Sequence, residues 1–182
     1  MKKLAGFIFL LFSTAANADF NNWDFELVKP SNPNEPVNWH LDVSPNIAGT
    51  VNMSQICIPN KYWILCEKKS VVINRTDSAV TGRAVLLPGP KFRVAVNPGS
   101  VYCFTAFLRS NRRFPIGVIE YGVNGAKLRE IIKPVLTKSD NTYYTLAPVC
   151  HAIQNGVRKL DVGVFLTSTG RVELAFQHLL PN

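Results

Sequence analysis

The segment 97–110 constrains the fold of this chain most strongly. It begins with a Pro-Gly turn and continues as a strand in which two sets of residues alternate, namely Tyr102, Phe104, Ala106 and Leu108 against Cys103, Thr105, Phe107 and Arg109. Alternation at period two places the two sets on opposite faces, so the first set is expected to face a core. This pattern is typical of a strand at the edge of a β-sandwich, and it suggests a binding module.

The rest of the chain favours an all-β domain. Pro, Asn and Gly are frequent, and no long stretch keeps a helical period. The β-branched run Val71-Val72-Ile73 indicates a strand clearly. We expect a single β-sandwich (jelly roll) of about eight to ten antiparallel strands. Residues 37–42 are expected to form a short extended piece, and 46–58 to carry a candidate strand. Besides these and the segment above, the expected strands are 69–74, 83–87, 91–96, 116–121, 127–132, 142–150, 158–166 and 171–179.

Two hairpins are expected from turn chemistry. The dipeptide Asn124-Gly125 joins 116–121 to 127–132, and Asn-Gly favours the tight turn of a β-hairpin. The segment 167–170 separates two further strands that alternate in hydrophobicity. We expect a second hairpin there, with core-facing residues Leu160, Val162, Val164 and Leu166 beside Val172, Leu174 and Phe176.

The first 18 residues have the pattern of a secretory signal peptide. Lys2 and Lys3 precede the apolar run 4–12, and small residues lead to a cleavage site after Ala18. The alternative, a membrane anchor, would need about 20 apolar residues to cross a bilayer. We therefore expect a secreted or periplasmic bacterial protein whose mature domain, 19–182, has no transmembrane segment.

The mature chain is basic. Removing Lys2 and Lys3 leaves 18 basic against 12 acidic residues. A solvated surface is the simplest reading of this charge. An exported sandwich would rarely meet nucleic acid, so anionic glycans or lipid head groups are the expected anionic partners.

The four cysteines are expected to pair outside the cytoplasm. The pair Cys57–Cys66 would close a short local loop, and the pair Cys103–Cys150 would join two strands that must then be neighbours. The competing reading is a zinc site, but the chain has no Cys-x-x-Cys spacing, and Cys150-His151 is the one close Cys/His pair. We expect no metal and no cofactor.

Three motifs together resemble the jelly-roll carbohydrate-binding modules of the galactose-binding-domain-like superfamily. They are Asn22-Trp23-Asp24-Phe25-Glu26 with the later Pro36-Val37-Asn38-Trp39, the strand entry 96–102, and the segment 119–125 that ends in Asn-Gly. The resemblance implies a sandwich that binds carbohydrate. The last strand carries 173–177, Glu-Leu-Ala-Phe-Gln, where such modules often show an Asp pair tied to calcium, so we expect no calcium dependence.

Sugar recognition gives a second route to candidate residues. Pyranose faces stack on aromatic rings, while planar polar side chains bond to adjacent hydroxyls. A core role is the favoured interpretation for Trp23, Trp39 and at least one residue of the pair Tyr143-Tyr144, because large aromatics fill sandwich interiors. Arg109 is equally consistent with a surface charge. The candidate ligand-binding residues are Trp63, Tyr62, Arg109, Tyr144, Trp39, Phe107 and Tyr121.

Catalysis is not expected from this sequence. His40, His151 and His178 are widely spaced and lie in no hydrolase or metal signature. A carboxylate pair such as Glu120 and Glu173 occurs by chance in any sandwich. The leading hypothesis is a secreted lectin-like glycan-binding protein. The alternative is an exported bacterial effector or adhesin that binds a protein or lipid surface of a host or another cell.

Overall fold

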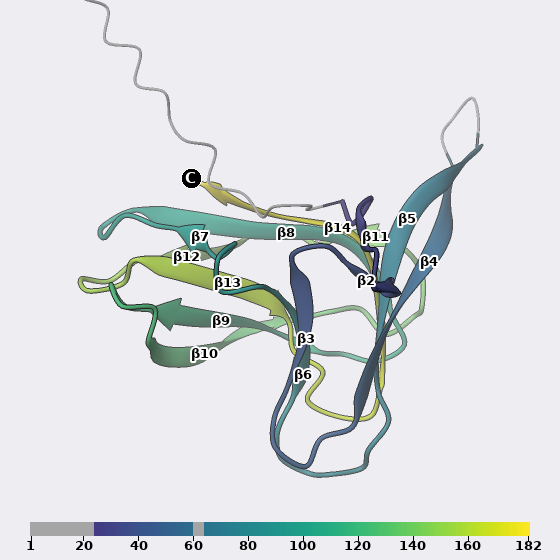
Figure 1. Ribbon diagram of the computed structural model, residues 1–182, viewed down its shortest axis with the longest axis horizontal. Helices are drawn as coiled ribbons and strands as arrows, with labels where there is room; N and C mark the ends of the chain where they lie inside the picture. Colours follow the sequence, from purple (N-terminus) through teal and green to yellow (C-terminus); the bar gives the residue numbers. More distant parts are fainter. Residues whose placement is uncertain (1–23, 60–63) are drawn as a thin grey trace, which may run out of the picture.

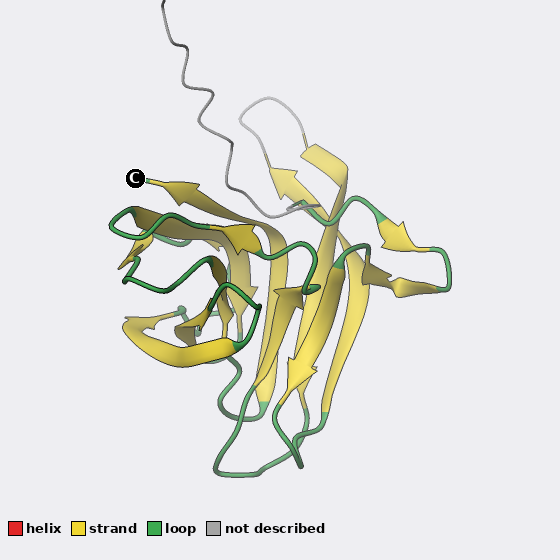
Figure 2. Cartoon of the chain, turned by 60° about the vertical axis from the view of Figure 1, so that its left-hand side comes forward, coloured by secondary structure: helices red, strands yellow, loops and turns green. Residues whose placement is uncertain are grey.

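The computed structural model describes residues 24–59 and 64–182, and their side chains except those of 57–68. These ranges form strands and loops, with no helix (Figures 1 and 2). Accordingly, no helix in them could span a bilayer. The expected all-β sandwich is confirmed.

One layer of the sandwich contains four strands in the order β10-β9-β13-β7. The pair β3 and β6 lies beside it, because Ala84 in β6 exchanges two backbone hydrogen bonds with Leu166, just after β13. The strands of this layer are β3 (Trp39–Val43), β6 (Ala84–Pro88), β7 (Val94–Ala95), β9 (Pro115–Tyr121), β10 (Lys127–Leu136) and β13 (Lys159–Val164).

The other layer has the strand order β11-β8-β14-β5-β4, with β12 also paired to β8. A small two-stranded sheet, β1 with β2, precedes both layers along the described chain. The bounds are β1 (Val28–Lys29), β2 (Asn32–Pro36), β4 (Gly49–Pro59), β5 (Ile64–Arg75), β8 (Val101–Ser110), β11 (Tyr144–Thr145), β12 (Val149–Ala152) and β14 (Gly170–Pro181).

Strand β8 has the predicted alternation. Tyr102, Phe104, Ala106 and Leu108 are buried, and the residues between them are partly exposed. Cys103 lies directly opposite Cys150 of β12, and the two form the predicted disulfide. The side chains of Cys57 and Cys66 lie outside the described residues, so that pairing stays a prediction.

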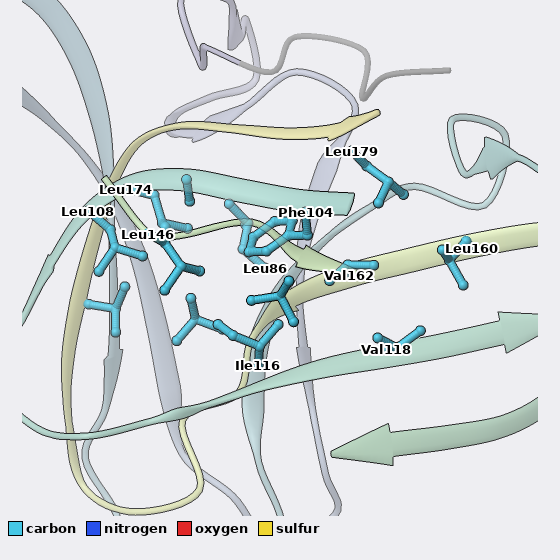
Figure 3. Packing of buried hydrophobic residues seen from close by; sticks show 14 of the residues in the cluster. Leu86, Phe104, Leu108, Ile116, Val118, Leu146, Leu160, Val162, Leu174 and Leu179 are labelled. Carbon is cyan, nitrogen blue, oxygen red and sulfur yellow. The ribbon is translucent and has the colours of Figure 1, made fainter. Parts of the chain in front are cut away.

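The main core lies between the two layers (Figure 3). Phe104, Leu108 and Leu174 project from one layer toward Ile116 and Val162 of the other. Burial of each such side chain contributes about 1.5–3 kcal/mol relative to exposure. This apolar contact joins the two sheets.

The first predicted hairpin is confirmed, since β9 and β10 are antiparallel neighbours. The second is wrong. Strand β13 pairs with β9 and β7, whereas β14 pairs with β5 and β8, so residues 167–170 cross from one layer to the other. A bulge between Leu174 and Phe176 also shifts the alternation by one residue, which turns Phe176 away from the core while Leu174 stays in it.

The segment 142–150 forms two short strands, β11 and β12, instead of the single predicted strand. Pro148 lies between them, and a proline has no N–H to donate to a continuous ladder. The predicted strand 91–96 is reduced to β7, which is two residues long.

A buried arginine shapes the loop that leads into β6. Arg75 donates hydrogen bonds to the Asp77 carboxylate and to the carbonyls of Ala79 and Gly82. Its side chain is fully buried, so these acceptors offset the cost of removing the charge from water. These hydrogen bonds hold the loop from Asp77 to Gly82, which leads to Arg83.

Gly117 in β9 lets an aromatic ring lie flat across the outer face of the sheet. A Cβ atom at this position would come within 2.2–2.4 Å of the Phe165 ring. Phe165 is fully buried there, so this contact belongs to the outer face of the layer and not to the main core.

We expect Gly117→Ala to destabilise the protein by about 1–3 kcal/mol, because the added methyl group must displace a packed ring. Urea unfolding measures this change. Gly122→Ala is the matched control, since its Cβ would meet no atom closer than 3.5 Å. Equal stability of the two variants would show that Phe165 does not pack on β9.

Candidate functional site

A groove with a volume of about 450 Å³ lies on the outer face of the layer that contains β9 and β10. Its lining residues come from β3, β6, β9 and β10 and from the loops next to them. Its polar and aromatic lining includes His40, Asp42, Arg83, Arg93, Tyr121 and Glu130.

Strand alternation explains how these side chains reach the groove. In β3, Trp39 packs into the main core. Because side chains alternate along a strand, His40 and Asp42 point to the opposite face. In β9, Val118 faces the main core, while Ile119 and Tyr121 belong to a separate apolar cluster. The groove therefore uses the second face of strands whose first face holds the sandwich together.

The separate apolar cluster forms the floor of the groove region. Its residues come from β6, from β9 and from the residue after β13, and each is at most 5% exposed. Apolar residues on both faces are typical of a sheet that is covered on both sides. The cluster consists of Val85, Leu87, Ile119, Tyr121 and Phe165.

Arg83 covers one ring of this floor and holds two carboxylates. Its guanidinium carbon lies 4.7 Å from the centroid of the Phe165 ring. It donates to both oxygens of Glu130, each at 2.9 Å, and to Asp42 at 2.8 Å. Lys127 also donates to Glu130. Burial alone would raise the pKa of Glu130, but the hydrogen bonds from Arg83 and Lys127 outweigh it and lower that pKa.

Arg93 covers the second ring but is held less completely. Its guanidinium carbon lies 3.6 Å from the centroid of the Tyr121 ring. Among the described residues its one hydrogen bond goes to the Gly125 carbonyl, at 3.3 Å. The Nε atom lies 3.3 Å from the Asp161 carboxylate and makes no hydrogen bond.

Asp161 is a buried carboxylate beneath this arginine. Its side chain has no exposed surface, and neither oxygen accepts a hydrogen bond of normal geometry from any described residue. Burial raises the pKa of Asp161 to about 7, although the Tyr121 hydroxyl and Arg93 both favour the charged form. Burial and the adjacent Asp161 in turn raise the pKa of Tyr121 above its usual range.

His40 completes the polar lining on the β3 side. Burial lowers its pKa, with Asp42 acting in the opposite direction, so the imidazole is neutral at pH 7. Its Nδ1 atom is buried and has no hydrogen-bond partner among the described residues. No group of three or more His, Cys, Asp or Glu residues in 24–59 and 64–182 is arranged to hold a metal ion.

Two of the predicted ligand residues lie on the opposite sheet. Phe107 stacks between Tyr143 and Phe176, with centroid distances of 5.3 and 5.7 Å. Arg109 lies over the Tyr143 ring and donates two hydrogen bonds to the buried Glu173. These rings cover one another's faces, so the row stabilises contacts between neighbouring strands.

The other predicted residues are spread over the molecule. Trp39 is 1% exposed and packs edge-on against Phe25, which is the core role that the sequence favoured. Tyr144 packs against the core, and its hydroxyl accepts a hydrogen bond from the Lys138 N–H. Tyr121 lines the groove beneath Arg93. Tyr62 and Trp63 lie outside the described side chains, and their role stays a prediction.

Sequence reasoning missed most of the groove. It selected Tyr121 but not Arg83, Arg93 or Asp161. One signal was present, because Asp161 interrupts the otherwise apolar run 160–166 of a predicted strand. A carboxylate at such a position must be buried or must face a polar site.

We expect the stability of the protein to fall as pH rises from about 4 to about 7, by up to about 1.4 kcal/mol per pH unit. The reason is that the Asp161 pKa is about 7 when folded against 3.8 for the ordinary group, so the folded state binds the extra proton in this range. Asp161→Asn removes this contribution, and its melting temperature should exceed that of the parent more at pH 8 than at pH 5. Asp42→Asn, in a more exposed carboxylate, is the control. A difference independent of pH would contradict this account.

No protein family and no curated protein sequence matches the chain. Among solved structures it is similar to the carbohydrate-binding module CtCBM11 (TM-score 0.51, 10% identity, 93% of this chain and 98% of that chain). It is also similar to the CBM22-1 xylan-binding domain of Paenibacillus barcinonensis Xyn10C (TM-score 0.51, 9% identity, 90% and 92%).

Larger proteins contain the same fold as one part. The chain is similar to a segment of the arabinose-bound α-L-arabinofuranosidase MgGH51 (TM-score 0.63, 14% identity, 90% of this chain). It spans 26% of that enzyme and 20% of the bacteriophage CBA120 tailspike protein 4, with which it also shares the fold. The chain thus has the jelly-roll fold of carbohydrate-binding modules.

Proposed function

We propose that this chain is an exported glycan-binding protein without catalytic activity, and that the groove above β9 and β10 is its binding site. The observation that carries the proposal is the set of planar polar side chains that Arg83 holds in fixed positions in the groove. The similarity of the fold to carbohydrate-binding modules, one of them xylan-binding, supports it. The signal-peptide pattern supports export.

The chemistry of the groove suits a sugar. Asp42 and Glu130 can accept hydrogen bonds from neighbouring hydroxyls, and arginine N–H groups can donate to them. Both carboxylates are already ordered by Arg83, so binding loses little side-chain entropy. Val43 is partly exposed at the groove and offers an apolar contact for the C–H face of a pyranose.

The ion pairs of the groove also argue against the alternative partners, which are a lipid surface and a protein surface. A lipid or protein surface would need a broad apolar or single-sign patch, whereas the groove alternates charge over a short distance. The aromatic row around Phe107 has its ring faces covered, so it offers no open platform. The groove is therefore the preferred site.

We expect His40→Ala and Asp42→Ala to weaken binding of a recognised glycan by about 1–3 kcal/mol each, because both side chains line the groove. A glycan array identifies the ligand, and isothermal titration calorimetry measures the affinity. Phe107→Ala and Arg171→Ala, on the opposite sheet, are matched controls that should bind as the parent does.

Three other results would count against this site. Loss of affinity in Phe107→Ala with no change in Asp42→Ala would move the ligand to the other sheet. Loss confined to Trp63→Ala would assign the site to the segment that contains residue 63. Absence of binding to every glycan, with retained binding to a protein or to vesicles, would replace the proposal with the interaction-protein alternative.

A further inference from the structure

The two groove arginines differ in how completely their donors are used. Arg83 makes three hydrogen bonds to carboxylates. Within the part of the chain that the structure describes, Arg93 makes one long hydrogen bond to a carbonyl, and its Nε atom makes none. A guanidinium has five N–H donors in a planar fork that fits a carboxylate. Arg93 therefore has donors left for an acidic ligand group.

The charges around the groove balance only while Asp161 is ionised. Three cations and three carboxylates lie in or under it, namely Arg83, Arg93 and Lys127 with Asp42, Glu130 and Asp161. Protonation of Asp161 removes one negative charge and leaves a net charge of one positive unit. The excess falls on Arg93, because Arg83 and Lys127 keep their own partners.

We propose that the groove selects a sugar that carries one carboxylate, with Arg93 as its anchor, and that Asp161 takes up a proton when this sugar binds. The inference rests on the proposed function and names the ligand class of that same site. The ligand carboxylate accepts hydrogen bonds from Arg93, and Asp161 then loses its share of the cation that forms its ion pair among the described residues. A neutral carboxylic acid costs far less in a buried site than an unpaired carboxylate.

The groups that face Asp161 are consistent with this coupling. Tyr121 approaches it from β9, and its own pKa is raised, so its hydroxyl stays a donor. Arg93 approaches from the segment before β7. Asp42 on β3 adds a negative charge nearby, which also favours the protonated form of Asp161. His40, the remaining titratable group on β3, is neutral and adds no competing charge.

The sign of the pH effect follows from linkage. Binding raises the pKa of Asp161 above about 7, which is its value in the protein without ligand. The ligand-bound protein therefore holds one more proton than the ligand-free protein when the pH is above 7. Affinity for the acidic sugar must then increase as pH falls toward 7, and it levels off below. The sugar carboxylate stays ionised across this range, because its pKa is that of an ordinary carboxyl group.

The test uses the methyl glycosides of galacturonate, glucuronate and mannuronate, each of which carries one carboxylate, and the methyl ester of each as its neutral counterpart. The proteins are the full mature chain, Asp161→Asn and Arg93→Gln, each checked for folding by its melting temperature. Calorimetry at pH 6, 7 and 8, in two buffers with different ionisation enthalpies, gives the affinity and the number of protons taken up.

For the parent protein we expect the dissociation constant of at least one uronate to fall by up to about fivefold from pH 8 to pH 7, with uptake of nearly one proton at pH 8. The methyl ester should bind independently of pH. Asp161→Asn should bind the uronate tightly at every pH, without proton uptake. Arg93→Gln should lose the preference for the uronate over its ester.

Three results would overturn the inference. If neutral glycans bind and Asp42→Ala weakens them, while uronates show neither preference nor proton uptake, the groove is a neutral-sugar site and the proposed function stands. If no glycan of either kind binds at any pH, the proposed function fails as well. A pH slope that persists in Asp161→Asn would assign the proton to another group.

Discussion

The structure depends on covering a sheet that is apolar on both faces. One face of β9, β13 and β6 packs against the other sheet and makes the main core. The second face carries its own buried cluster of five residues. Two arginines, Arg83 and Arg93, provide the cover by lying on the Phe165 and Tyr121 rings. This stacking combines dispersion with cation–π attraction at a site that is partly shielded from water.

This solution has an electrostatic consequence that defines the site. A guanidinium held against a ring needs acceptors for its N–H groups, and carboxylates supply them. Arg83 forms ion pairs with two carboxylates that are partly exposed, those of Asp42 and Glu130, so these ion pairs are ordered and remain accessible to water. Arg93 forms an ion pair with Asp161, whose carboxylate has no exposed surface and accepts no hydrogen bond of normal geometry from any described residue. One pair is therefore complete, and the other can still respond to a ligand or to pH.

The sequence was informative wherever a local pattern decides the structure. The alternation of β8, the Asn-Gly hairpin and the Cys103–Cys150 pairing are all confirmed, since each depends on residues close in the chain or on one strand contact. The predicted hairpin of β13 with β14 is wrong, because four residues can either turn within one sheet or cross to another. Nothing in the local sequence distinguishes these two paths.

The site was harder to predict than the fold for the same reason. Arg83, Glu130 and Asp161 are far apart in sequence, and only the order of strands β3, β6, β9, β10 and β13 brings them together. The predicted residues Phe107 and Arg109 do meet, but on the opposite sheet and with their contacts already used. An alternating strand identifies an outward face. It does not reveal whether that face forms a groove.

The central claim is that the groove face binds the ligand, and backbone amide NMR during a glycan titration tests it most directly. The account predicts chemical-shift changes that concentrate on β3, β6 and β10 and on the residues around Arg93, with the outward residues of β8 and β14 unaffected. Changes that concentrate on Phe107, Phe176 and their neighbours, with His40, Asp42 and Glu130 unchanged, would contradict it.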